Sequence, residues 1–370
     1  MIINQKKGDR LIKIYKTPAE IPFNPTDVFL HFTGNIFGIG CSAFNEFAIN
    51  KILDLKQRDA NRGFILLFSS MEQIKQYDFK EFKIHKIYSL LNQYLPGNLT
   101  TIFKTEDIRF KNIWQNQKVA IRIPTSKVLR DFIEQIGHPI VSSSINVSGL
   151  SFCSDINILH RQFSDWFDYG LHDEDEKADL PLPSTILDVA KNESDEMQIK
   201  CLREGSIPFA EIKESFQNPL VQFVCVGNIC RSPMAEQYAN IRFKEENLPF
   251  RVASCGLIEN RKMISEGSKA VMKKNDILPT QSVSIQVDEN IVRRSFLLIC
   301  MSKDIKKHLL ARFAEAANKT FTFAEYTENL QEIDDPYGLD FSHFEKAFDL
   351  IKKYTDDLIV KLKNYYLRSI

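Results

Sequence analysis

The strongest constraint on the fold is the stretch from Val221 to Met234, which reads V-Q-F-V-C-V-G-N-I-C-R-S-P-M. Its apolar start predicts a short buried strand that leads to Cys225. Ser232 and Pro233 are favoured at the N-cap and at the first position of a helix, so we expect a helix from Pro233 onward. A strand, a tight loop and a helix N-terminus then converge on one point. Their N–H groups predict a site for an anion.

Two side chains in this stretch give the site its chemistry. A thiol at Cys225 would be held where the anionic thiolate is favoured. Arg231 would add a two-pronged donor that matches phosphate oxygens. The simpler alternative is a buried core cysteine followed by an ordinary surface arginine. The spacing of Cys, Arg and Ser around Gly227 and Asn228 argues against that alternative.

The stretch V-C-V-G-N-I-C-R-S-P-M-A-E resembles the signature of the low-molecular-weight protein tyrosine phosphatases. The resemblance implies that Cys225 is the nucleophile that accepts the phosphoryl group and that Arg231 binds its equatorial oxygens. It also implies that Cys225 and Cys230 pair as a reversible disulfide under oxidation. Ser232 would hydrogen-bond the thiolate and Asn228 would fix the loop. The residues that would support the phosphate loop are Gly227, Asn228, Cys230 and Ser232.

A phosphatase of this type also needs a proton donor for the leaving oxygen. The family carries it as an Asp before Pro, far behind the loop, and this chain has Asp334-Asp335-Pro336-Tyr337-Gly338. Asp335 is therefore the expected general acid, with Asp334 as the fallback. By itself such a segment is typical of a turn. Its distance behind the Cys–Arg loop favours the catalytic interpretation.

The phosphatase substrate is less constrained. Arginine phosphatases of the same fold carry Thr where this chain has Ile229, which favours a tyrosine-type substrate, and Tyr337 would flank its ring. Arsenate reductases use the same loop but need further cysteines close together, and Cys300 has no neighbouring cysteine in the sequence. A small phosphorylated metabolite stays open as an alternative to a phosphotyrosine protein. No cofactor is expected for this domain.

The N-terminal half carries several weak signals. The glycine-rich run from Gly34 to Gly40 matches neither a dinucleotide fingerprint nor a Walker loop. Arg122 lies within a predicted strand, where an arginine usually occupies the wet face. The run I-V-S-S-S-I-N-V-S-G from Ile140 to Gly149 begins as a predicted buried strand and carries several hydroxyls and an amide where the chain leaves that strand. These groups either make local turn bonds or form the polar floor of a ligand site.

Six short motifs in this half resemble, in order, the YrdC-like threonylcarbamoyl-AMP synthase family. The similarity covers about residues 10 to 210 and implies a twisted α/β sheet over a concave groove. It implies the synthesis of threonylcarbamoyl-AMP and pyrophosphate from L-threonine, bicarbonate and ATP, for threonylcarbamoyl modification of tRNA adenosine. The motifs are L-K-Q-R at 55–58, P-G-N-L-T at 96–100, V-A-I-R-I-P at 119–124, V-S-S-S-I-N-V-S-G at 141–149, S-T-I-L-D at 184–188 and L-R-E-G at 202–205.

The resemblance assigns two sets of binding residues and no covalent protein intermediate. ATP, with Mg²⁺ as part of the substrate complex, would be bound by Lys56, Arg58, Ser144, Asn146 and Arg203; L-threonine would be bound by Thr33, Arg122, Ser142 and Ser184. One motif departs from the family pattern P-T-D-T-V-Y-G-L-G, because this chain reads F-T-G-N-I-F-G-I-G over Phe32–Gly40. The alternative is therefore an active phosphatase fused to a degenerate YrdC-like module that only binds RNA or a nucleotide.

The whole sequence is expected to form an α/β protein with two domains. Residues 1–208 would be the YrdC-like twisted α/β sheet domain, 209–219 a polar linker, and 220–370 a doubly wound parallel α/β phosphatase domain. Lys plus Arg equals Asp plus Glu, 48 each, so net charge predicts no polyanion partner, although tRNA or tRNA-modifying proteins follow from the resemblance. The seven cysteines form no metal pattern, and an odd number suggests a reducing, cytoplasmic location. No apolar run approaches the ~20 residues of a membrane span, so no membrane partner is expected.

Overall fold

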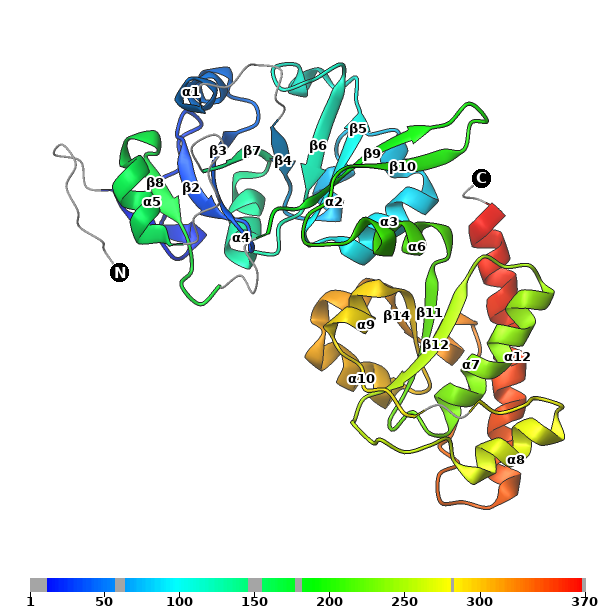
Figure 1. Cartoon of the computed structure of the whole chain (residues 1–370). Helices are drawn as coiled ribbons and strands as arrows, with labels where there is room; N and C mark the ends of the chain where they lie inside the picture. The colour runs from blue at the N-terminus through cyan, green and yellow to red at the C-terminus, as the bar shows by residue number, and fades with distance from the viewer. Residues whose placement is uncertain (1–11, 57–63, 146–154, 177–181, 281–282, 368–370) are drawn as a thin grey trace. The chain divides into compact units, whose positions relative to one another are not determined.

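The computed structural model describes residues 12–56, 64–145, 155–176, 182–280 and 283–367. The chain divides into two compact units, Met1–Glu211 and Ile212–Ile370, which are described separately (Figure 1). Each unit combines helices with its own β-sheet. This agrees with the α/β class expected from the sequence.

The first unit is built on a mixed sheet, which has ten strands among the described residues, in the order β1-β8-β2-β3-β7-β4-β6-β5-β9-β10. The strands are β1 Ile14–Tyr15, β2 Phe29–Phe32, β3 Phe37–Ser42, β4 Ile65–Leu67, β5 Leu99–Lys104, β6 Lys118–Arg122, β7 Ile140–Ser144, β8 Tyr169–Leu171, β9 Thr185–Lys191 and β10 Met197–Arg203. The helices are α1 Glu46–Lys56, α2 Met71–Ile74, α3 His85–Tyr94, α4 Lys127–Ile136 and α5 Ile156–Phe163, with single 3-10 turns at Pro18–Glu20, Glu81–Lys83, Ile108–Phe110 and Ser164–Trp166.

The second half of the glycine-rich run, Phe37–Gly40, belongs to strand β3, which pairs antiparallel with both β2 and β7. Its glycines leave room for His31, which is fully buried on β2. A Cβ at Gly40 would lie 3.0 Å from His31 Cε1 and 2.7 Å from the Val141 carbonyl oxygen. The run therefore accommodates a buried imidazole within the sheet.

Helix α4 shows how local sequence fixes the ends of an element. The Ser126 hydroxyl accepts a hydrogen bond from the Leu129 N–H at 3.1 Å and so caps the N-terminus. Gly137 ends the helix with a φ of 74°, the left-handed conformation that glycine adopts readily. Phe132 and Ile133 are completely buried on the inner face of the helix.

The second unit has a parallel sheet with the order β12-β11-β13-β14. The chain first adds β12 on one side of β11 and then returns to add β13 and β14 on the other, which confirms the predicted doubly wound topology. Helices α9 and α10 cover one face, and α7, α8 and α12 cover the other (Figure 1). The elements are β11 Leu220–Cys225, α7 Arg231–Glu245, β12 Arg251–Gly256, α8 Glu266–Lys274, α9 Glu289–Arg294, β13 Ser295–Cys300, α10 Lys303–Arg312, a 3-10 segment Ala314–Lys319, β14 Thr320–Thr322, α11 Phe323–Tyr326 and α12 Phe341–Leu367.

The segment expected to be a polar linker contains helix α6, Phe209–Gln217. Ile212 and Phe216, four residues apart, are buried on one face of it. The segment therefore gains its structure from an apolar stripe that its overall polarity conceals. Of the helices that the structure describes, none is long and apolar enough to cross a membrane.

Candidate functional sites

The loop between β11 and α7 surrounds the sulfur of Cys225. Cys225 is the last residue of β11 and is 3% exposed. The Asn228 N–H donates to its Sγ at 3.2 Å, and the Ser232 hydroxyl donates at 3.0 Å. Helix α7 begins at Arg231, two residues before the predicted start. The Ser232 hydroxyl therefore points to the thiol and does not cap the helix, and two donors converge on one sulfur.

Asn228 holds this loop in shape. Its φ of 53° is a left-handed conformation that Asn tolerates better than most side chains. Its amide nitrogen Nδ2 donates to Ser232 Oγ at 3.1 Å and to Ser254 Oγ at 2.7 Å. Its Oδ1 accepts from the Ile285 N–H at 2.9 Å. Asn228 thus joins the loop to strand β12 and to the segment before α9.

Beside the loop, Ser254 donates to Glu236 Oε2 at 2.6 Å. Burial raises the pKa of Glu236. Gly227 is also constrained, because a Cβ there would lie 2.8 Å from Asn260 Nδ2. The sequence assigned no role to Ser254, Glu236 or Asn260. Two signals were present, because Glu236 ends the phosphatase signature and Ser254 begins Ser254-Cys255-Gly256, where the family commonly has S-A-G.

Arg231 meets Asp335 at the same site. The Arg231 guanidinium is 4% exposed. Its Nη1 donates to the Ile333 carbonyl oxygen at 3.0 Å, and its Nη2 forms an ion pair with the Asp335 carboxylate. Asp335 lines a pocket of about 220 Å³ together with Cys225, whereas Asp334 is not among its lining residues.

The rest of this pocket is mainly apolar at its mouth. Ile258 and Tyr337 are more than half exposed there, and the other lining residues are Val226, Gly227, Ile229, Cys230, Asn260 and Lys262. Cys230 donates to Ser265 Oγ at 3.2 Å, and burial raises the pKa of its thiol. Cys225 and Cys230 are both free cysteines. Their reversible disulfide stays a prediction.

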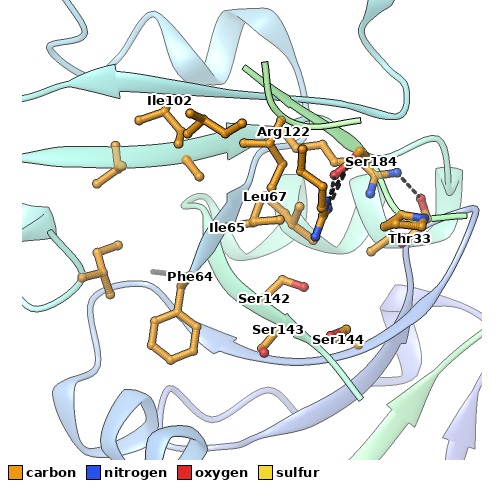
Figure 2. A pocket seen from close by; sticks show the side chains of 18 of the residues that line it. Thr33, Phe64, Ile65, Leu67, Ile102, Arg122, Ser142, Ser143, Ser144 and Ser184 are labelled. Carbon is orange, nitrogen blue, oxygen red and sulfur yellow. Dashed lines mark hydrogen bonds between the residues drawn. The ribbon is translucent and has the colours of Figure 1, made fainter. Parts of the chain in front are cut away.

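A second and larger cavity, about 530 Å³, lies in the first unit. It brings together six of the residues predicted for this half: Thr33, Arg122, Ser142, Ser144, Ser184 and Arg203. Figure 2 shows Thr33, Arg122 and Ser184 grouped at one end, with Ser142, Ser143 and Ser144 opposite. Lys56 joins them indirectly, since its Nζ donates to the Ser144 carbonyl oxygen at 2.6 Å. Two further predicted residues, Arg58 and Asn146, lie outside the described residues.

Arg122 is the central cation of this cavity. It is 2% exposed, unlike an arginine on the wet face of a strand. Its Nε donates to the Gly97 carbonyl oxygen at 2.8 Å, and its Nη2 donates to Asn35 Oδ1 at 2.9 Å and to Asn98 Oδ1 at 2.6 Å. Burial, and secondarily the nearby Arg203, lowers the pKa of Arg122 to about 9. The guanidinium is therefore still protonated at neutral pH.

The charges around the cavity favour an anion. Lys118, Arg122 and Arg203 line it, and no carboxylate is among the described residues that do so. Lys118 is already paired with Asp188 at 2.7 Å. Arg203 donates to the Ser184 carbonyl oxygen at 2.9 Å, and burial lowers its pKa. Because neither guanidinium has an acidic partner among the described residues, an anionic ligand would offset their desolvation.

The departure from the family motif has a structural consequence at Gly34 and Asn35. Gly34 has a φ of 93°, and a Cβ there would lie 1.7 Å from Thr125 Oγ1, so only glycine fits this backbone. The Asn35 side chain is 2% exposed and donates to the Leu182 carbonyl oxygen at 2.6 Å. The Thr33 hydroxyl lies 2.8 Å from Asn35 Oδ1 and 2.7 Å from the Ile36 carbonyl oxygen. Asn35 therefore ties Thr33 to Arg122.

The serines of the cavity also have internal partners. Ser142 Oγ lies 2.9 Å from His31 Nε2, and burial lowers the pKa of His31 to about 4, so the imidazole is neutral at physiological pH. Ser184 Oγ lies 2.8 Å from Thr100 Oγ1. In the described part of the chain, no cluster of His, Cys, Asp or Glu could hold a metal ion. A Mg²⁺ ion in the large cavity would depend on oxygens of the nucleotide itself.

Comparisons with known proteins separate the two units. Residues 30–205 match the YrdC-type family model described as "Telomere recombination", and residues 220–366 match the model for low molecular weight phosphotyrosine protein phosphatase. The threonylcarbamoyl-AMP synthase of Vibrio parahaemolyticus is 30% identical over 158 residues, which cover 42% of this chain and 84% of the relative. That of Klebsiella pneumoniae is 31% identical over 143 residues, covering 38% and 74%.

The solved structures similar to this chain match about two fifths of it and nearly the whole of their own chains. The YwlE arginine phosphatase from Geobacillus stearothermophilus is 28% identical and covers 41% of this chain and 97% of its own, with a TM-score of 0.38. The low molecular weight protein tyrosine phosphatase from T. tengcongensis is 29% identical and covers 39% and 99%, also with a TM-score of 0.38.

These matches define the class of the molecule as a fusion of two enzyme domains, one of nucleotidyltransferase type and one of hydrolase type. The chain belongs to the threonylcarbamoyl-AMP synthase family through its N-terminal part and carries a low-molecular-weight protein tyrosine phosphatase domain in its C-terminal part. Both resemblances noted in the sequence are thereby confirmed.

Proposed function

We propose that the chain is a bifunctional enzyme. Its C-terminal domain hydrolyses phosphomonoesters of the phosphotyrosine type through a cysteinyl-phosphate intermediate. Its N-terminal domain forms L-threonylcarbamoyladenylate and pyrophosphate from L-threonine, bicarbonate and ATP, and this product serves the modification of tRNA adenosine. The observation that carries the phosphatase half is the convergence of two hydrogen-bond donors on Cys225 Sγ, next to the Arg231–Asp335 pair.

In the phosphatase step, Cys225 Sγ attacks phosphorus and the bond from phosphorus to the leaving oxygen breaks. Asp335 gives its proton to that oxygen. A water molecule, from which Asp335 then takes a proton, releases inorganic phosphate and restores the thiolate. Loop N–H groups and Arg231 stabilise the charge on the equatorial oxygens. A bound phosphoryl group takes over the hydrogen bonds of Arg231, and this frees Asp335 to carry its proton.

The role of Asp335 predicts a dependence on the leaving group. We expect Asp335→Asn to lower kcat about 10²- to 10⁴-fold for phenyl phosphate, whose leaving oxygen needs a proton. The loss should be much smaller for para-nitrophenyl phosphate, whose leaving group departs as the anion. Asp334→Asn is the matched control, one residue away and outside the pocket lining. An equal loss on both substrates in Asp335→Asn would contradict the acid role.

For the synthase half, the support is a cavity lined by the buried Arg122 guanidinium and the more exposed Arg203 guanidinium, with an apolar end formed by Phe64 and Ile102 (Figure 2). In this proposal Arg122 pairs with the threonine carboxylate, with Thr33, Ser142 and Ser184 around the amino acid. Lys56, Arg203 and Ser144 contact the phosphates of ATP, with Arg58 and Asn146 completing that set. Catalysis comes from positioning the reactants and stabilising charge.

The synthase activity is tested by incubating the full chain with ATP, L-threonine and bicarbonate and measuring pyrophosphate. We expect release that requires all three substrates. Release at background level, combined with retained binding of ATP or tRNA, would favour the alternative of a degenerate binding module.

A further inference from the structure

The mouth of the phosphatase pocket carries a cation that the proposed reaction does not use. Lys262 lines the same pocket as Cys225 and Tyr337. Its neighbour Arg261 is paired with Glu259. Asp335, the only carboxylate among the described residues of the lining, is paired with Arg231. Among the described residues, the Lys262 ammonium has no acidic partner. A second anion on a substrate would therefore meet an available positive charge.

The backbone that carries Lys262 is fastened to the phosphate loop. The Leu257 and Ile258 N–H groups donate to the Cys225 and Val226 carbonyl oxygens at 3.0 and 3.1 Å, and the Ser265 N–H donates to the Ile229 carbonyl oxygen at 2.8 Å. Asn260 Nδ2 adds a bond to the Gly227 carbonyl oxygen at 3.3 Å. This wall of the pocket is therefore held in register with the nucleophile.

The position of Lys262 itself is fixed from the other side. Its N–H donates to Ser284 Oγ at 3.2 Å, its carbonyl oxygen accepts from the Ser284 N–H at 2.9 Å, and Met263 bridges antiparallel to Val283. The side chain is exposed at the end of an anchored backbone. A lysine in this position can bind an anionic group of the substrate outside the phosphoryl group, without contacting the reacting atoms.

We infer that this domain selects phosphotyrosine-type substrates whose neighbouring residues are acidic, with Lys262 as the residue that recognises the second anion. The inference rests on the proposed phosphatase function. Ile258 and Tyr337 offer apolar surface to an aromatic ring, and Lys262 supplies the only unpaired charge in the described pocket lining. An exposed ion pair is weak and screened by salt, so the preference is modest and falls with ionic strength.

The test compares two phosphotyrosine peptides that differ only in having Glu or Gln on both sides of the phosphotyrosine. With the full chain at low salt, kcat/KM should favour the Glu peptide by about two- to fivefold. Lys262→Gln should bring the ratio close to one, and Lys262→Glu should reverse it. Arg261→Gln is the matched control, since it removes an adjacent surface charge that lies outside the pocket lining.

The possible outcomes separate the two levels of the proposal. A wild-type ratio of one, or a ratio unchanged in Lys262→Glu, overturns the acidic preference while phosphate release stands. A loss of the ratio in Arg261→Gln that equals the loss in Lys262→Gln also overturns it, because general surface charge would then explain the effect. If the wild-type chain releases no phosphate from either peptide or from para-nitrophenyl phosphate, the proposed phosphatase function fails and the inference falls with it.

Discussion

Replacing Cys225 by Ser is expected to abolish phosphate release, with a fall in kcat of about 10⁴-fold or more on para-nitrophenyl phosphate. The Asn228 N–H and the Ser232 hydroxyl would still point to this position, but a serine hydroxyl does not ionise near neutral pH. The loop and Arg231 remain, so binding of a non-hydrolysable aryl phosphonate should persist. Retained binding without turnover would separate loss of the nucleophile from loss of the fold.

Cys300→Ser is the matched control for this experiment. Cys300 ends strand β13, where it pairs in register with Val224 beside the catalytic strand. It is fully buried, and burial raises the pKa of its thiol to about 12, so it is an inert thiol. The substitution should cost some stability and leave kcat within about threefold. Normal turnover by Cys225→Ser, or an equal loss in Cys300→Ser, would refute Cys225 as the nucleophile.

The phosphatase loop was predictable because its information is local. Strand, thiol, arginine and helix start follow one another within fourteen residues, so spacing alone placed them together. Where prediction erred, a tertiary contact decided the outcome. The local pattern favours Ser232 as an N-cap, whereas the family resemblance places its hydroxyl on the thiolate. The hydroxyl bonds the thiol, and the helix begins at Arg231. That Arg231 and Asp335 belong to one site could be predicted only from the family pattern, because no local signal links residues so far apart in the sequence.

In the N-terminal unit, the sequence predicted which residues lie near the cavity but not which partners hold them in place. An arginine within a strand usually lies on the solvent-exposed face. Arg122 is instead buried and bonds to Gly97, Asn98 and Asn35 on distant segments. The signal for Asn98 was present, because it lies within P-G-N-L-T. Asn35 stood out only as a departure from the family. A single sequence does not reveal that such a departure creates a new hydrogen-bonded link.

Short secondary-structure elements were also hard to predict from the sequence. The segment that forms helix α6 has the composition of a linker, because its buried apolar residues are outnumbered by polar ones. Strand β3 was read as a glycine-rich run because its glycines match no strand propensity. Their function, room for His31, appears only once β2 and β3 pair. A local pattern therefore does not reveal the close approach of two strands.

Arg122→Lys is expected to reduce pyrophosphate release about 10²- to 10³-fold, chiefly through a higher KM for L-threonine. A lysine keeps the charge but loses the planar fork, and the Gly97, Asn35 and Asn98 oxygens would no longer be satisfied together. Initial rates at varied threonine and at varied ATP separate the two sites.

Arg109→Lys provides the control, because Arg109 is exposed, pairs with Asp107 and lies outside the cavity lining. It should leave both KM values unchanged. Thermal unfolding of Arg122→Lys checks that the first unit still folds, and its phosphate release checks the second. A threonine KM that does not change, with a raised KM for ATP alone, would move Arg122 to the nucleotide. In that case the first candidate to pair with the amino-acid carboxylate would be Arg203, the other guanidinium of the cavity, since Lys118 is already paired with Asp188.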